Sequence, residues 1–173
     1  MIIQFLYEDG RSQVHDFLQS IRFQAEADSD YAHTFEGMMK VIAHLHQMKW
    51  LPYNLKNYWI SLKTTNGYKK FHPLQSIPSP SYHLKLYEIR YNHIYSTDPR
   101  TLHWGARIFF FRERVNKQQV LFLTRALMVY DTLDLELNRK SEELYEVCRQ
   151  LSFEIYIDFL ENPSKYLLRG NDS

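Results

Sequence analysis

The chain has 173 residues, of which 45% are hydrophobic and 24% are charged, so it is long enough to bury one sizeable core. Its single cysteine, Cys148, excludes an internal disulfide framework and suits a reducing compartment, and the sequence lacks a run of about 20 apolar residues that could span a membrane. We therefore expect one domain over residues 1–173, cytoplasmic and without a membrane partner.

The net charge is only +1, but basic and acidic residues are concentrated in different parts of the chain. Residues 40–125 contain fourteen Lys or Arg against three acids, a net charge of +11, whereas residues 1–39 and 126–173 each carry −5. A basic middle between acidic ends is an electrostatic footprint for a polyanion such as nucleic acid. The alternative is that these charges only solvate exposed faces.

The first third of the chain predicts a strand and two helices. Residues 2–8 favour a strand, and Ser12 is placed to cap a helix over 13–25. Apolar residues at helical spacing predict a second helix that begins at 31 or 34 and ends at 49, before Pro52.

The middle of the chain predicts β structure after an irregular stretch. Residues 53–83 favour a short helix or strand near 55–62 and then a long surface loop, because Asn66-Gly67 and three prolines favour turns. Three strands are expected over 84–91, 106–114 and 118–127. Their closeness in sequence favours an antiparallel meander, with the long connection 91–105 projecting over the sheet.

The last part of the chain is helical in pattern. Apolar spacing from about residue 133 predicts one or two C-terminal helices, with a break near Pro163. Cys148 falls inside this pattern, where a buried structural thiol is expected rather than a nucleophile. The predicted fold class is α+β, with an N-terminal strand and two helices packed on an antiparallel sheet and additional C-terminal helices.

Three short motifs, in this order of elements, resemble the RelE/ParE toxin superfamily, most closely its HigB-like, phage-derived branch. They are IIQFLYEDGRSQVHDFL at the start, LYEIR at 86–90, and ARIFFF at 106–111 followed by QQVLFLTRAL. The resemblance covers about residues 1–150, so the segments near 63–83 and 91–105 are expected insertions, and the helical part from about 133 is an expected extension. It implies a ribosome-dependent mRNA endoribonuclease, neutralised by a helix-turn-helix antitoxin, that needs no metal and no small-molecule cofactor.

Two arginines are the first candidate site residues. A guanidinium matches phosphate in a planar, bidentate way, and the predicted strands carry arginine beside apolar runs. The resemblance places Arg90 on the arginine of the family's LYELR motif and Arg107 on the arginine of its YRIFYF-like strand. In active relatives such cations hold the scissile phosphate and stabilise the charge that develops on it.

The chain departs from the family pattern one strand later. HigB-like chains continue with a histidine and a lysine-rich segment, and here Thr124, Met128 and Val129 stand in those positions. Arg125 is the expected substitute as a phosphate contact, and Tyr130 is the expected substitute as a proton-transfer group.

Further RNA contacts are expected from cations and aromatic rings near the strands. These are Lys69, Lys70, Lys85, Arg112, Arg114, Tyr91 and Trp104. The alternative for the two aromatics is packing of the 91–105 connection onto the sheet. His93 and His103 are either acid–base groups or ordinary loop histidines, and the scattered histidines do not predict a metal site.

Two other functions stay open. A catalytically degenerate, phage-derived relative could keep the fold and the basic surface as an RNA- or protein-binding module, which the missing lysine segment favours. The third hypothesis is a structural or regulatory phage protein that binds another protein.

Overall fold

A computed structural model of the chain describes residues 1–52, 54–64, 67–78, 83–93 and 101–167. The described strands are β1 (Ile2–Phe5), β2 (Ile60–Thr64), β3 (Gly67–Phe71), β4 (Leu74–Ile77), β5 (Leu86–His93), β6 (Thr101–Val115) and β7 (Gln118–Thr132). The described α-helices are α1 (Gln13–Gln24), α2 (Ser29–Gln47) and α3 (Leu135–Glu161), and η1 (Leu55–Asn57) and η2 (Pro163–Lys165) are short 3₁₀ turns. The chain is therefore α+β, as its sequence predicts.

The central sheet has five strands in the order β1-β7-β6-β5-β4, and β2 and β3 form a separate hairpin. The pairs β4–β5, β5–β6 and β6–β7 are antiparallel, which confirms the meander predicted for the last three of these strands. β1 instead lies parallel to β7, with Ile2 opposite Val120, so the sheet is mixed and not antiparallel throughout. Two helices separate β1 from the rest of the sheet in sequence, and this distance allows a parallel pairing that a short turn would exclude.

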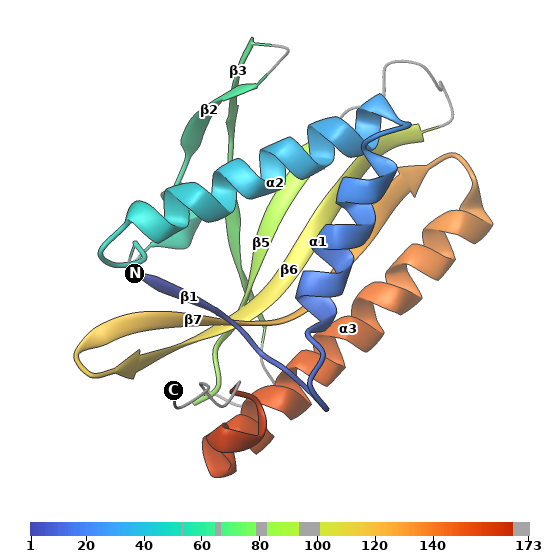
Figure 1. Cartoon of the computed structure of the whole chain (residues 1–173). Helices are drawn as coiled ribbons and strands as arrows, with labels where there is room; N and C mark the ends of the chain where they lie inside the picture. Colours follow the sequence, from blue (N-terminus) through green and yellow to red (C-terminus); the bar gives the residue numbers. More distant parts are fainter. Residues whose placement is uncertain (53, 65–66, 79–82, 94–100, 168–173) are drawn as a thin grey trace.

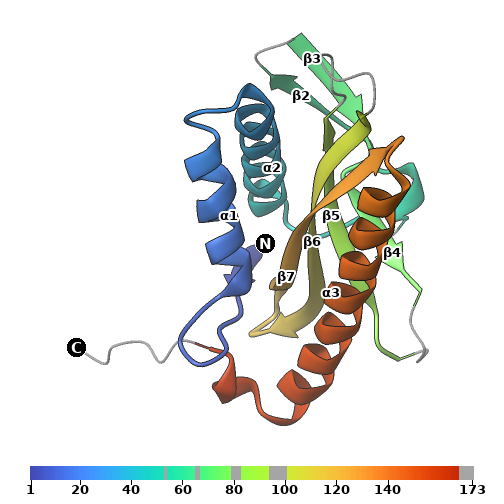
Figure 2. The same ribbon diagram turned by 90° about the vertical axis from the view of Figure 1, so that its right-hand side faces the viewer.

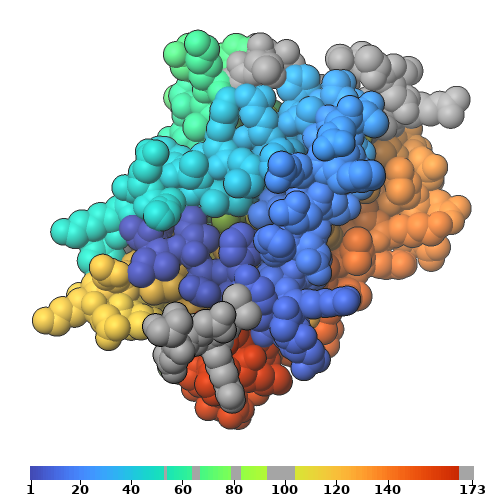
Figure 3. Space-filling view, viewed as in Figure 1, coloured from blue at the N-terminus to red at the C-terminus, as the bar shows by residue number. Residues whose placement is uncertain are grey.

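Helices cover both faces of the sheet. α1 and α2 lie on one face and α3 lies on the other (Figures 1 and 2). In the space-filling view, α1 and α2 hide most of the central strands on their side (Figure 3). This arrangement explains the apolar run in β6: Ile108 and Phe110 pack in the core under α1 and α2, whereas Phe109 and Phe111 pack under α3.

Side-chain caps begin each helix where the sequence supplies one. Ser12 accepts a hydrogen bond from the backbone N–H of His15, as predicted for α1, and Asp28 caps α2 in the same way. The Asp134 carboxylate accepts from two N–H groups in the first turn of α3. α3 is one 27-residue helix, and Cys148 is buried in it against the sheet, as expected.

The two expected insertions contain more regular structure than loops. The long surface loop expected after residue 62 is wrong, because the 63–83 segment includes the end of β2, the whole of β3 and the edge strand β4. The connection expected over 91–105 is shorter, because β5 continues to His93 and β6 already begins at Thr101; residues 94–100 lie outside the described residues.

Candidate functional site

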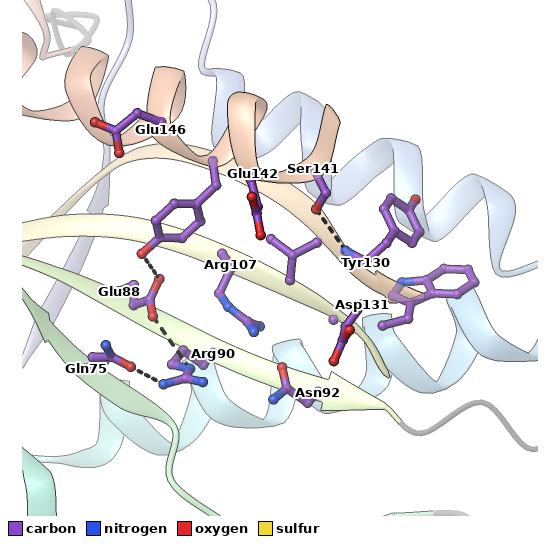
Figure 4. A pocket seen from close by; sticks show the side chains of 14 residues that line it. Gln75, Glu88, Arg90, Asn92, Arg107, Tyr130, Asp131, Ser141, Glu142 and Glu146 are labelled. Carbon is purple, nitrogen blue, oxygen red and sulfur yellow. Dashed lines mark hydrogen bonds and ion pairs between the residues drawn. The ribbon is translucent and has the colours of Figure 1, made fainter. Parts of the chain in front are cut away.

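Arg90 and Arg107 lie directly opposite each other in the β5–β6 ladder. Both side chains line a pocket of about 730 Å³ between the sheet and α3 (Figure 4). The pocket is lined by Gln75, Glu88, Arg90, Asn92, Trp104, Gly105, Arg107, Val129, Tyr130, Asp131, Ser141, Glu142, Tyr145 and Glu146. The structure thus brings together the two arginines that the sequence singles out.

The Arg107 guanidinium is desolvated and sparsely paired. Burial lowers its pKa to about 10, with the carboxylate of Glu88 acting in the opposite direction and the charge of Arg90 adding to the lowering. Within the described part of the chain, its one hydrogen bond runs from Nη1 to the carbonyl oxygen of Ala106, at 3.0 Å. Because this pKa lies well above 7, the guanidinium remains protonated at neutral pH. It has five N–H donors, so donors are left for an anion in the pocket.

Arg90 sits closer to the open edge of the sheet. Its Nη1 donates a hydrogen bond to Oε1 of Gln75 on β4, and its Nε lies 3.5 Å from Oε1 of Glu88. The Arg90 side chain is 31% exposed, so a ligand can reach it. Gln75 and Glu88 hold the orientation of its guanidinium.

Glu88 is the residue of this site that sequence reasoning missed, together with Tyr145. Glu88 is 3% exposed, and its Oε2 accepts a hydrogen bond of 2.9 Å from the phenol of Tyr145 on α3. Burial, and then the neighbouring Glu88 charge, raise the pKa of Tyr145 well above its ordinary value, so the phenol stays a donor. The alternation of a strand already puts Glu88 on the same face as Arg90, but the approach of Tyr145 depends on how α3 docks.

Gly105 lines the pocket at a place where β5 and β6 leave no room for a side chain. A Cβ on this residue would overlap the backbone carbonyl of Tyr91 and come within 2.6 Å of the Asn92 side-chain oxygen. Any larger residue here would push β5 and β6 apart beside Arg107.

Carboxylates outnumber cations in this pocket. Besides Glu88, its lining includes Asp131, Glu142 and Glu146, against two arginines. This excess of negative charge disfavours a long polyanion lying along α3, and it leaves the immediate surroundings of the two arginines as the place for one anionic group.

The other two expected catalytic residues lie differently. Arg125 is outside the residues that line the pocket and forms an ion pair with Glu8 near the start of α1. Tyr130 does line the pocket, but burial and a hydrogen bond with Tyr31 raise its pKa far above the ordinary value. The Tyr130 ring points away from the two arginines in Figure 4, so neither residue completes the arrangement around Arg90 and Arg107.

The two aromatic candidates are packing residues in this structure. Tyr91 is buried under α2, where a Cβ on Gly37 would overlap its ring. Trp104 is also buried and packs edge-on against Tyr31, with ring centroids 4.5 Å apart. The expected alternative was that they pack a loop onto the sheet; instead both belong to sheet strands, Tyr91 to β5 and Trp104 to β6, and pack against α2.

The remaining cationic candidates are spread over the surface. Lys69 donates to the backbone carbonyl of Asn92 and lies 4.8 Å from the ring centroid of Tyr91, and burial lowers its pKa. Lys70 is exposed on β3, and Arg114 lies over the ring of Trp50, 5.5 Å from its centroid. Lys85 and Arg112 line a second groove. The side chains of His93 and His103 lie outside the described residues.

No family model, curated protein or solved structure matches the chain. Across the described ranges, no three His, Cys, Asp or Glu side chains are grouped as metal ligands. None of the described helices combines the length and the apolar character that crossing a membrane requires.

Proposed function

We propose that the chain is a RelE/HigB-like, toxin-type endoribonuclease that cleaves mRNA on the ribosome in the cytoplasm and is neutralised by a helix-turn-helix antitoxin. The observation that carries the proposal is the convergence of Arg90 and Arg107, as direct cross-strand partners, in one pocket. The mixed sheet with two helices on one face and the basic middle of the sequence are compatible with this assignment.

In this proposal the two guanidiniums hold the scissile phosphate and stabilise the charge that develops on it. Glu88, 3.5 Å from Nε of Arg90, accepts the proton of the 2′-hydroxyl, and Tyr145 keeps the Glu88 carboxylate in position. The 2′-oxygen then attacks phosphorus and the bond to the 5′-oxygen breaks, which leaves a 2′,3′-cyclic phosphate and a 5′-hydroxyl. Solvent in the pocket protonates the leaving oxygen.

A ribosome-supplemented cleavage assay tests this function. We expect wild type to arrest translation and to cut mRNA, and Arg90→Ala or Arg107→Ala to reduce cleavage by about 100-fold. Arg139→Ala, which removes an exposed cation from α3, is the matched control and should cleave as wild type does. Intact RNA with the wild-type protein and ribosomes would contradict the proposal.

Binding without cleavage is the second candidate function. It is favoured by Tyr130, whose hydroxyl interacts with Tyr31 and not with the arginine pair. On this reading, Arg90→Ala and Arg107→Ala weaken RNA binding, while expression of the wild-type protein leaves growth and transcripts unchanged.

A further inference from the structure

A second groove, of about 860 Å³, lies along β4, the edge strand of the sheet, between η1 and the start of β5. Figure 2 shows β4 at this open edge. The ionised residues among its lining are all basic: Lys56, Lys85, Arg90 and Arg112. Its described lining contains no aspartate or glutamate, in contrast to the pocket under α3.

The groove and the pocket meet at Arg90. Arg90 and Gln75 line both, and the hydrogen bond between them crosses from β5 to β4. A nucleic-acid strand with one phosphate at Arg90 can therefore continue into the groove, where further cations line its path.

Charge decides which way such a chain runs. The pocket beyond Arg90 places Asp131, Glu142 and Glu146 near the next phosphates, which would repel them. The groove places Lys56, Lys85 and Arg112 there instead. Backbone phosphates next to the one held at Arg90 are accordingly stabilised only on the groove side.

These cations are available to a ligand. Lys56 and Lys85 are exposed, and within the described part of the chain neither forms an ion pair. Arg112 lies over the ring of Tyr87, 5.0 Å from its centroid, which fixes its position without neutralising its charge.

An exposed aromatic ring stands beside the groove. Trp59 is 54% exposed and packs edge-on against His72, a lining residue, with ring centroids 5.6 Å apart. Cations that follow a backbone next to an aromatic platform are the combination that binds single-stranded nucleic acid, because every base has a π-face that can stack.

We propose that this groove binds single-stranded RNA that flanks the phosphate held at Arg90, with Lys56, Lys85 and Arg112 on the phosphates and Trp59 stacked on a base. The proposal deepens the proposed function and rests on it, since it assigns the path of the substrate strand.

The test measures the affinity of the full chain for a labelled 2′-O-methyl oligoribonucleotide as a function of salt; the methyl group prevents cleavage. The variant Lys56→Ala/Lys85→Ala should bind about tenfold more weakly than wild type. Its slope of log affinity against log salt should fall by about 1.4, because each lost phosphate contact on a single strand contributes about 0.7. Arg139→Ala/Lys140→Ala on α3 removes the same charge from exposed positions and should keep the wild-type slope.

Trp59→Ala separates stacking from charge. We expect a loss of about tenfold in affinity with the wild-type salt slope, because a base–aromatic stack is not a counterion-release contact. Unchanged thermal unfolding midpoints in all variants show that the losses belong to binding.

Failure of the groove and failure of the catalytic proposal give different results. If Lys56→Ala/Lys85→Ala binds with the affinity and slope of wild type while Arg90→Ala loses binding, the groove proposal is overturned and the phosphate site stands. If the double variant loses binding and the wild-type protein cleaves no RNA, the groove stands and the endoribonuclease fails. Poly-glutamate that competes as well as the oligonucleotide, with Trp59→Ala neutral, would assign the groove to an acidic polypeptide and overturn the RNA assignment.

Discussion

The phenol of Tyr145 on α3 donates a 2.9 Å hydrogen bond to Oε2 of Glu88 on β5. This bond ties the long helix to the sheet beside Arg90 and Arg107, and it satisfies a carboxylate that is 3% exposed. An unsatisfied buried carboxylate is costly, so the pair sets both the stability of this layer and the position of Glu88.

Tyr145→Phe removes the donor and leaves the ring in place. We expect the free energy of unfolding to fall by about 2 kcal/mol, because Glu88 loses a hydrogen bond to a charged acceptor. Urea denaturation measures this change. Tyr68→Phe is the matched control, since Tyr68 is 79% exposed, and it should unfold with the wild-type midpoint; equal midpoints for both variants would show that the Tyr145 bond does not form in solution.

Glu88→Gln keeps the shape of the side chain and removes its charge. If Glu88 accepts the 2′-hydroxyl proton, cleavage should fall by a factor of about 100 to 10 000. The affinity for a 2′-O-methyl oligonucleotide should not fall, because a negative charge next to the phosphate site disappears. Cleavage at the wild-type rate would remove Glu88 from the mechanism.

Anion binding should depend on pH through Arg107, whose pKa burial lowers to about 10. The protonated guanidinium binds the anion, so the affinity should be highest at neutral pH and should fall at alkaline pH. A bound anion favours the charged form and raises the pKa of Arg107, so the fall should occur somewhat above pH 10. The measurement is the affinity of the protein for the 2′-O-methyl oligonucleotide at a series of pH values from 7 to 11. Arg107→Ala should bind weakly at neutral pH. Its affinity should still fall at high pH because the lysines lose their charge, but the further fall due to Arg107 should be missing. A pH profile identical in shape to that of wild type would contradict this role.

Arg125→Ala should affect stability and not binding. Arg125 is paired with Glu8 and lies away from the pocket, so the expected loss is about 1 kcal/mol in the free energy of unfolding. Oligonucleotide affinity should equal that of wild type. A loss of affinity as large as that of Arg90→Ala would place Arg125 at the RNA after all.

Local sequence patterns were sufficient for most of the elements. Ser12 marked the start of α1, and the apolar run Ile108 to Phe111 marked a strand, which the structure buries on both faces. The parallel pairing of β1 with β7 was not predictable in this way, because it joins residues more than 100 positions apart.

The candidate site was predictable only in part. Arginines beside apolar strand segments, together with the resemblance to the RelE/ParE superfamily, selected Arg90 and Arg107, and the β5–β6 register places them opposite each other. Arg125 was selected from its position along β7. The β6–β7 register shifts next to it: Phe109 pairs with Arg125, but Phe110 pairs with Leu123, so β7 has one extra residue at this point. A bulge of this kind re-aims side chains, and its position is set by tertiary packing such as the 2.8 Å hydrogen bond from Thr124 to Ser152 on α3.

The central claim is that Arg90 and Arg107 hold one phosphate together, and a double-mutant cycle on 2′-O-methyl oligonucleotide binding tests it most directly. Wild type, Arg90→Ala, Arg107→Ala and the double variant are compared at one salt concentration. We predict that each single change weakens binding and that the double variant loses less than the sum of the two, with a coupling free energy of at least about 0.5 kcal/mol. Strictly additive losses, or single variants that bind as wild type does, would contradict a shared phosphate.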